Sequence, residues 1–322
     1  MLRPVRNRRV SRRSALLGLA GVVLGGSTPA LLSACTREAT LSITEIRLAT
    51  GPAGAVYRRI GGGLADILDR RYPSATVTAV PSHASTDNIR MLLEDEVHLG
   101  LANLDAAVGL DAEPPAGIAA LCRLYDSHLH LAVLADSPIR TVGDLEGRRV
   151  SYGAEDSGTD FTSRRLIDLT GIGLRPVWLD QAESARALAA RDIDATFSLT
   201  GVPTPAISDL AERRPIRLIP MPQEADALAD AYPGPYFPAT IPATAYHDVP
   251  ACPTLAIPNV LLARTDLPVD VAKAVTEAVF TEAPAIASDV PEATQINVRT
   301  GIATGPIPLH PGAAEWFRDQ KR

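Results

Sequence analysis

Two short glycine-containing loops contain the residue types best suited to bind an anion. They are residues 51–54 (GPAG) and residues 156–159 (DSGT), and each lies between a predicted strand and a predicted helix. Loops in this position direct backbone amides and the positive end of the helix dipole toward the carboxyl edge of a sheet. In the second loop, Ser157 and Thr159 add hydroxyl donors, and Gly158 allows close approach of the backbone. The alternative is that Ser157 or Thr159 only caps the helix that follows.

Motifs that would indicate an enzyme are absent from the sequence. The GPAG loop lacks the third glycine of a dinucleotide fingerprint, and no P-loop, His-Glu-x-x-His or Gly-x-Ser-x-Gly motif occurs. Asp126, His128 and His130 would share one face of a strand and could hold a metal. Because that strand is mostly apolar, buried and hydrogen-bonded histidines are the expected alternative. We therefore expect no catalytic residue, no metal site and no cofactor.

The hydrophobic pattern predicts an α/β fold made of two units with the same rhythm. The first unit has predicted strands at residues 42–50, 76–80 and 98–102, helices at 56–71 and 87–94, and further strands at 118–125 and 129–135. The second has predicted strands at residues 150–153, 176–179 and 195–199 and helices at 161–169, at 183–190 and from about 203. Short strand–helix–strand connections of this kind produce a parallel sheet covered by helices.

The chain is long enough for two lobes, which we expect to be connected twice. Residues 45–135 together with about 250–322 are predicted to form lobe 1, and about 136–249 lobe 2. The turn formers of residues 137–145 predict the first crossover between the lobes. The proline-rich stretch 232–253 cannot be regular helix, which suits a return crossover or a loop over the cleft. A strand at 259–263 and a helix at 269–280 are expected to follow.

The first 35 residues have the features of an export signal. They hold six arginines and no acidic residue, and an apolar run follows at residues 15–32. Residues 11–17 (SRRSALL) resemble a twin-arginine signal, and residues 32–35 (LSAC) resemble a bacterial lipobox. We expect residues 1–34 to be a twin-arginine/lipoprotein signal peptide and Cys35 to carry lipid, which holds an extracytoplasmic protein to the membrane, at the cell surface or in the periplasm. An uncleaved transmembrane anchor is the alternative.

Removal of this leader leaves a strongly acidic chain. The remaining 25 basic residues stand against 37 acidic ones, a net charge of about −12. Such a surface argues against nucleic acid as a partner, because phosphate binding requires positive charge. Cys122 and Cys252 remain, and they either pair in an oxidising compartment or stay buried thiols.

A series of short motifs runs through nearly the whole chain from about residue 45. They are residues 48–57 (LATGPAGAVY), 61–64 (GGGL), 85–89 (STDNI), 99–105 (LGLANLD), 144–151 (DLEGRRVS), 156–159 (DSGT), 201–205 (GVPTP) and 307–314 (IPLHPGAA). Together they resemble the TRAP-associated extracytoplasmic immunogenic family, or TAXI, of solute receptors. The chain departs from that family in a first loop with fewer hydroxyls, and in Asn103, where glutamine is common.

The resemblance implies a two-lobed, hinge-linked fold of the periplasmic-binding-protein type (type II) with a central cleft. It also implies a binding function, in which a small organic acid or a glutamate-like amino acid is captured for the membrane subunit of a TRAP transporter. The cleft residues carried over by position are Tyr57, Asn88, Asn103, Asp105, Ser157, Gly158, Thr159 and Thr204. Asp105 would either bind a ligand ammonium or cap the next helix. A ligand sensor for a signalling receptor and an enzyme on a bilobal scaffold are the alternatives.

Overall fold

The computed structural model of the chain describes residues 40–52, 55–109 and 114–321. The predicted signal peptide and Cys35 lie outside these residues, as do Ala53 and Gly54 of the first loop. No helix within the described ranges is long and apolar enough to cross a membrane.

Strands and helices alternate along most of the chain, as the sequence predicts. The strands are β1 (Glu45–Ala49), β2 (Thr76–Val80), β3 (Leu99–Asn103), β4 (Ile118–Leu134), β5 (Arg149–Ser151), β6 (Arg175–Val177), β7 (Ala195–Thr200), β8 (Ile216–Leu218), β9 (Phe237–Ile241) and β10 (Cys252–Arg264). The α-helices are α1 (Val56–Arg71), α2 (Ser85–Leu93), α3 (Leu104–Val108), α4 (Gly158–Thr170), α5 (Gln181–Ala190), α6 (Pro205–Arg213), α7 (Pro222–Ala231), α8 (Val269–Ala287), α9 (Val298–Gly301) and α10 (Pro311–Asp319). Two 3-10 helices, η1 (Val142–Leu145) and η2 (Pro291–Gln295), complete the set.

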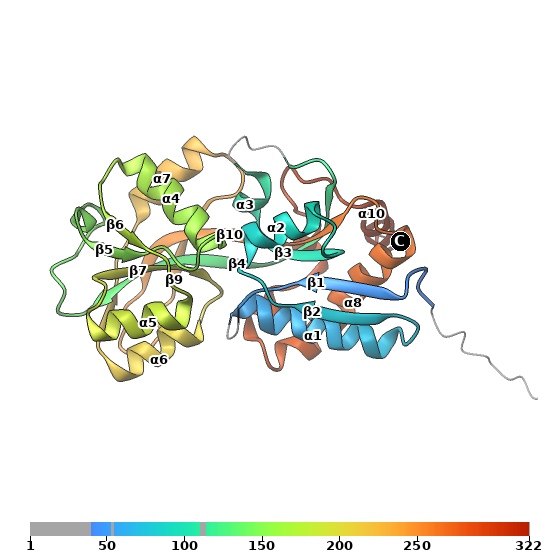
Figure 1. Ribbon diagram of the computed structural model, residues 1–322, viewed down its shortest axis with the longest axis horizontal. Coiled ribbons are helices and arrows are strands. Elements are labelled where there is room, and N and C mark those ends of the chain that lie inside the picture. Colours follow the sequence, from blue (N-terminus) through green and yellow to red (C-terminus); the bar gives the residue numbers. More distant parts are fainter. Residues whose placement is uncertain (1–39, 53–54, 110–113, 322) are drawn as a thin grey trace, which may run out of the picture. The chain divides into compact units, whose positions relative to one another are not determined.

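The ten strands of the described residues belong to one mixed sheet, in the order β2-β1-β3-β10-β4-β7-β5-β6, with β8 paired to β4 and β9 to β10. At one end β1 lies parallel to β2 and β3, and at the other end β5 lies parallel to β6 and β7. We call β1–β3 with the helices packed on them the first half, and β5–β9 with α4–α7 the second half (Figure 1). The two long strands β4 and β10 are antiparallel and run through both halves.

The change from one half to the other takes place inside these two long strands. In β10, residues 259–263 pair with β3 of the first half, whereas residues 252–256 pair with β9 of the second. In β4, pairing with β7 begins only at His128. The two strands predicted at 118–125 and 129–135 are therefore one strand, because no turn interrupts the backbone between them. The crossover predicted at 137–145 is instead a turn and η1 beyond the end of β4.

The proline-rich stretch 232–253 is not helical, as predicted, but it is more regular than a crossover or a loop over the cleft requires. It contains β9 and the start of β10, which pair with each other from Cys252 opposite Ile241 to Ala256 opposite Phe237. Pro238 is tolerated in β9 because this strand pairs only with β10 and so lies at an edge of the sheet.

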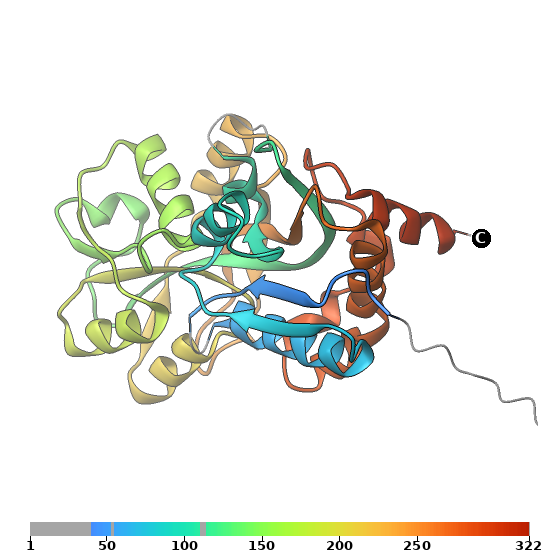
Figure 2. The ribbon, with the colours of Figure 1, turned by 45° about the vertical axis from the view of Figure 1, so that its right-hand side comes forward.

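The two faces of the sheet are covered differently. One hydrophobic core lies under α1, α8 and α10 on the first half, and another lies under α5 and α6 on the second half. On the opposite face a single core contains residues of α2, α3, α4 and α7 and so extends over both halves. Figures 1 and 2 show α8 and α10 packed together at the end of the first half, far from β5 and β6.

The helices that bear on the site begin and end for local reasons. In α1, Ile60, Leu64 and Leu68 recur at helical spacing and are buried in the first-half core, so the predicted range 56–71 is confirmed. Helix α4 begins at Gly158, three residues before its predicted start, because the hydroxyl of Ser157 accepts the amide of Asp160 at 3.1 Å.

Candidate functional site

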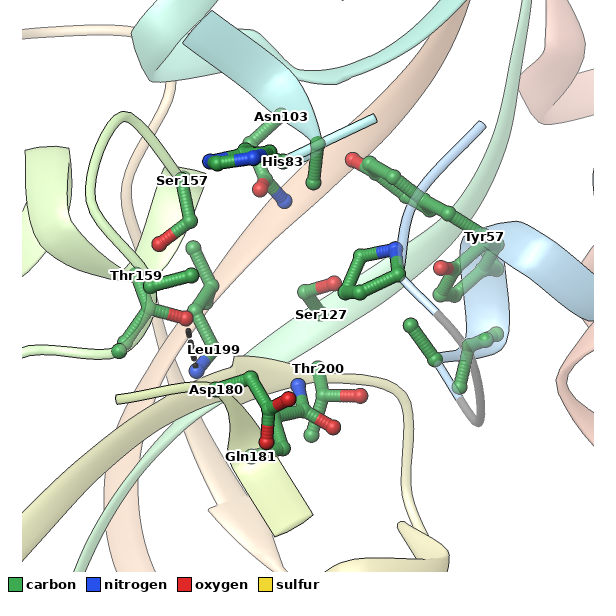
Figure 3. Close-up of a pocket in the computed structure, with 18 residues that line it drawn as sticks. Tyr57, His83, Asn103, Ser127, Ser157, Thr159, Asp180, Gln181, Leu199 and Thr200 are labelled. Atoms are coloured by element: carbon green, nitrogen blue, oxygen red, sulfur yellow. Dashed lines mark hydrogen bonds between the residues drawn. The ribbon is translucent and has the colours of Figure 1, made fainter. Parts of the chain in front are cut away.

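A cavity lies between the two halves, and loops from both contribute to its wall (Figure 3). Its volume is about 60 Å³, which is room for a few water molecules or a small ligand. The lining residues are Pro52, Ala55, Val56, Tyr57, His83, Ala84, Asn103, Tyr125 and Ser127, together with Gly153, Ala154, Ser157, Gly158, Thr159, Asp180, Gln181, Leu199 and Thr200. The predicted cleft between two sets of strand–helix loops is therefore present.

The start of α4 forms the wall on the side of the second half. Ser157 is the N-cap residue, and its hydroxyl oxygen already accepts a hydrogen bond from the helix, so its proton is available to a ligand. The hydroxyl oxygen of Thr159 accepts the amide of Leu199 at 3.1 Å, which likewise leaves its proton available. The first amides of a helix have no acceptor within the helix. This wall therefore presents hydrogen-bond donors and the positive end of a helix dipole.

A buried polar network forms the opposite wall. Tyr57, at the start of α1, donates to the side-chain oxygen of Asn259 in β10. Asn103 donates to the same oxygen at 2.9 Å, and the amide nitrogen of Asn259 donates to Ser127 Oγ at 2.9 Å. Burial raises the pKa of Tyr57, so this hydroxyl stays neutral. Asn259 thus links α1, β3 and β4 behind the cavity.

Gly158 brings the two walls into direct contact. A Cβ atom at this position would collide with Asn103 Oδ1 and would lie 2.7 Å from Ser85 Oγ. Asn103 and Ser85 are both buried in the first half, and they hydrogen-bond to each other at 2.9 Å. Only glycine allows α4 to approach this pair so closely. A backbone hydrogen bond from the amide of Asp87 to the carbonyl of Asp156, at 3.3 Å, joins the halves beside it.

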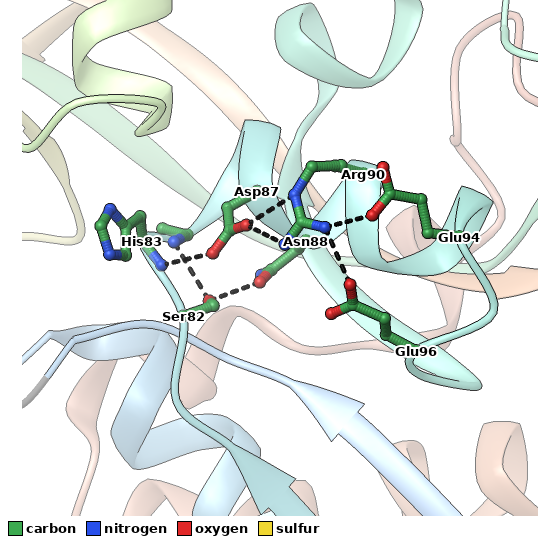
Figure 4. A network of polar contacts seen from close by, with 8 residues as sticks. Ser82, His83, Asp87, Asn88, Arg90, Glu94 and Glu96 are labelled. Atoms are coloured by element: carbon green, nitrogen blue, oxygen red, sulfur yellow. Dashed lines mark hydrogen bonds and ion pairs between the residues drawn. The ribbon is translucent and has the colours of Figure 1, made fainter.

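The loop that carries His83 and Ala84 to the cavity is held by the start of α2 (Figure 4). The carboxylate of Asp87 accepts the amide of His83 at 3.0 Å and also pairs with Arg90 at 2.8 Å. Arg90 in turn pairs with Glu96 at 2.9 Å. Ala84 has a φ of 86°, which is unfavourable for a residue with a side chain and is a form of strain that often occurs at binding sites.

The electrostatic character of the cavity comes from neutral donors. Among its described lining residues none is lysine or arginine, and Asp180 is the one carboxylate. Asp180 caps α5, where its side chain accepts the amide of Glu183 at 2.7 Å. An anion in the cavity would therefore be held by hydroxyls, amides and a helix dipole, without a full positive charge beside it.

Five of the predicted cleft residues line the cavity: Tyr57, Asn103, Ser157, Gly158 and Thr159. The side chain of Asn88 is instead fully buried behind the cavity, where its amide donates to the carbonyls of Thr50, at 2.8 Å, and Leu101, at 2.6 Å. It joins the end of β1 to the middle of β3 because its helix packs on the sheet.

Asp105 and Thr204 also lie away from the cavity. Asp105 is in the first turn of α3, where its side chain accepts the amide of Ala106 at 2.8 Å, and it faces α4. Burial raises the pKa of Asp105, against the hydrogen bonds it accepts. Thr204 is the N-cap residue of α6, and its amide donates to the hydroxyl of Tyr246 at 3.1 Å.

Several cavity residues were not predicted from the sequence. His83, Ser127 and Asp180 line the cavity, and Asn259 connects its polar residues. Asp180 is three residues before Glu183, a capping-box spacing that marks a helix start at the same sheet edge and could have indicated it. Asn259 lies within an apolar strand, and nothing local indicates its partners.

Of the two histidines on β4, His130 has the buried, hydrogen-bonded environment that was the alternative to a metal site. His130 is buried, and its Nδ1 atom lies 3.1 Å from the carbonyl of Ser198 while Nε2 lies 2.8 Å from the hydroxyl of Tyr246. Burial lowers the pKa of His130 to about 4, so the ring is neutral. In the part of the chain that the structure describes, no group of three or more His, Cys, Asp or Glu residues is placed to hold a metal.

Cys122 and Cys252 are both free and buried. Cys122 lies opposite Leu261 in the β4–β10 pair, and Cys252 is nine residues from Leu261 along the same strand. At the rise of an extended strand this separation is about 30 Å, well beyond the reach of a disulfide. The fold therefore permits the alternative in which both cysteines stay buried thiols, and not the disulfide.

Solved structures share this fold at low sequence identity. The chain is similar to XAC2383 from Xanthomonas citri bound to ATP, with 14% identity and a TM-score of 0.50 over 86% of this chain and 95% of that one. The periplasmic aliphatic sulphonate binding protein SsuA from Escherichia coli has 17% identity and a TM-score of 0.47, over 86% and 79%. A putative L-cystine ABC transporter from Listeria monocytogenes has 14% identity and a TM-score of 0.48, over 79% and 99%.

The predicted α/β, two-lobed, periplasmic-binding-protein-like fold is confirmed.

The assignment to the TAXI family of TRAP receptors is wrong. Residues 48–320 match the model of a different family, described as the NMT1-like family. The motifs that suggested TAXI are mostly strand ends, glycine-containing loops and helix starts, which any two-lobed protein with loops at the carboxyl edges of its sheet requires. Since the match covers most of the sequence, the chain belongs to the NMT1-like family.

Proposed function

We propose that the protein closes its two halves around a small anionic solute, and that the closed form delivers the solute to the membrane subunit of a transporter. The observation that carries this proposal is the cavity, where the first amides and hydroxyls of α4 face Tyr57 and Asn103 of the other half. A negative group at the start of a helix is stabilised by the helix dipole and by unpaired amides. No bond is made or broken in this cycle.

The walls suggest what the rest of the solute is like. Val56, Tyr125 and Leu199 make much of the cavity surface apolar, which favours a solute with a short apolar body behind its anionic group. An ammonium group of a glutamate-like amino acid would lie toward Asp180. A small organic acid without an ammonium group would leave that carboxylate to solvent. Carboxylates and sulfonates present the same anionic oxygens to the donors of α4.

The proposed binding residues divide by role. Ser157 and Thr159 donate hydroxyl hydrogen bonds to the anionic group, and Gly158 contributes its amide and the close approach of α4. Tyr57 and Asn103 form the facing wall, held in place by Asn259. By population-shift arithmetic, nearly complete closure needs about 5 kcal/mol of preference for the closed form, which a few charge-assisted hydrogen bonds supply.

The cellular setting follows from the leader and the fold. We infer that residues 1–34 are removed on export and that lipid on Cys35 holds the protein at the outer side of a membrane. The first half would then move against the second, with the hinge inside β4 and β10 where their pairing changes from one half to the other. This places the lobe boundaries within these two strands, a few residues from the predicted bounds of 45–135 with about 250–322 for lobe 1 and about 136–249 for lobe 2.

Calorimetry with acetate, butyrate, butanesulfonate and glutamate tests the binding proposal. We expect Ser157→Ala and Thr159→Ala each to weaken binding of the preferred anion by about 1 to 3 kcal/mol, because a buried anionic oxygen loses a donor. Thr170→Ala is the matched control, since it deletes a hydroxyl of the same helix that donates only to the carbonyl of Ile167. Unchanged affinity in both cavity variants, with melting temperatures showing both folded, would remove these hydroxyls from the site.

A further inference from the structure

Asp105 is a fully buried carboxylate of the first half that accepts hydrogen bonds from the second half. Its Oδ2 atom accepts from the hydroxyl of Thr162 at 2.6 Å and from the hydroxyl of Tyr236 at 3.0 Å. Thr162 belongs to α4, and Tyr236 immediately precedes β9. Asp105 does not line the cavity. The carboxylate therefore joins the two halves at a place outside the cavity.

A buried arginine completes this junction. Arg165 donates to the hydroxyl of Tyr236 at 3.0 Å and to the carbonyl of Gly109, in the first half, at 2.8 Å. The Tyr236 hydroxyl accepts from Arg165 and donates to Asp105, so it connects the two opposite charges. A buried charge that loses its partner destabilises the protein, so the residues of this group remain in contact with one another. We call this group the clasp; it consists of Asp105, Thr162, Arg165 and Tyr236.

The clasp lies one helical turn from the part of α4 that faces the cavity. Asn103 and Asp105 are two residues apart, at the end of β3 and the start of α3. They contact Gly158 and Thr162, which are four residues apart on α4. Residues four apart lie on the same face of a helix, so both contacts fix the same face of α4. Holding Thr162 therefore also fixes the direction in which the first amides of α4 point.

We propose that Asp105 is a positioning residue, which through the clasp holds α4 against the first half and keeps its first amides directed at the solute. This inference rests on the proposed function. It adds that Asp105, which does not touch the solute, contributes to the affinity for the solute. Loss of one clasp hydrogen bond lets the halves separate in the protein without solute. It also weakens binding of the solute about tenfold, as expected for one hydrogen bond to a buried charge.

Two conservative variants test the clasp without deleting its charges. Thr162→Val and Tyr236→Phe each remove one hydroxyl and keep the shape of the side chain. Thr170→Val is the matched control, because its hydroxyl lies on the same helix and donates only within that helix. Melting temperatures establish that all three variants are folded.

The distance between the halves can be measured directly, with or without a solute. Nitroxide labels at Asp66→Cys on α1 and at Glu212→Cys on α6 are both exposed and lie in opposite halves. The full chain would carry Cys35→Ser to prevent lipidation, and the native Cys122 and Cys252 are buried from the labelling reagent. Double electron–electron resonance then gives the distribution of label distances.

We expect the two clasp variants, without solute, to shift this distribution to longer distances than the control does. We also expect their affinity to fall about tenfold for whichever of butyrate, butanesulfonate or glutamate binds the unchanged protein. Distances equal to those of the control would overturn the proposal, even if melting temperatures fall, because the group would then have only a structural role. If the unchanged protein binds none of these anions, the proposed function fails, while the distances still decide whether the clasp holds the halves.

Discussion

Replacement of Gly158 by alanine tests whether the contact between the halves is required for binding. The new methyl group would overlap Asn103 Oδ1 and would lie 2.7 Å from Ser85 Oγ, where ordinary contact begins at 3.4 Å. Neither neighbour can easily move, since Ser85 is fully buried and Asn103 is held by Asn259. The least costly response is for the two halves to move apart.

The cost of this overlap can be placed on a scale. Extra volume in a packed site costs about 1 to 3 kcal/mol, which corresponds to a loss of about 5- to 150-fold in solute affinity. Gly158 does not have a positive φ, so alanine fits its backbone conformation in an open form of the protein. We therefore expect the affinity to fall much more than the free energy of unfolding.

Isothermal calorimetry with the preferred anion measures this effect, and urea unfolding without solute measures stability. Gly62→Ala, in α1, is the matched control because a Cβ atom there would meet nothing within 4 Å. We expect this control to bind the anion like the unchanged protein. If Gly158→Ala also binds with unchanged affinity, the close approach of α4 to Asn103 is not part of binding, and the reasoning is refuted.

Two further predictions concern a buried histidine and the lipid anchor. The pKa of His130 is lowered from 6.5 to about 4, so the unfolded chain binds a proton at a higher pH than the folded protein does. The free energy of unfolding should then fall as pH decreases from about 6.5 to about 4, and this residue should contribute on the order of 3 kcal/mol to that fall. In urea titrations, His130→Gln should make the free energy of unfolding depend less on pH over this range. An unchanged pH dependence would contradict this prediction. In cells given labelled palmitate, we expect label in the unchanged protein and none in Cys35→Ala; label retained by the variant would rule out Cys35 as the lipid site.

Much of the local structure could be predicted from the sequence because it depends on neighbouring residues. The helical spacing of Ile60, Leu64 and Leu68 defines the buried face of α1, and this spacing is visible without any knowledge of what packs on it. In the same way Ser157 marks the start of α4, and its position after a predicted strand indicates an anion-binding loop. Strand ends, caps and loop positions therefore predicted the fold class and part of the cavity.

The partners of the buried polar residues were decided by tertiary structure alone. Tyr57 and Asn259 are 202 residues apart and meet only because β10 pairs with both β3 and β4, with a register shift in the β4 pairing at Asn259. A slip of one residue would turn Asn259 to the other face of the sheet. The same applies to Asp105, for which the sequence left a ligand ammonium and a helix cap as alternatives, and whose Oδ2 atom the fold directs to α4. Local patterns encode periodicity and caps, whereas contacts between distant segments depend on register and on how the halves pack, which no local pattern specifies.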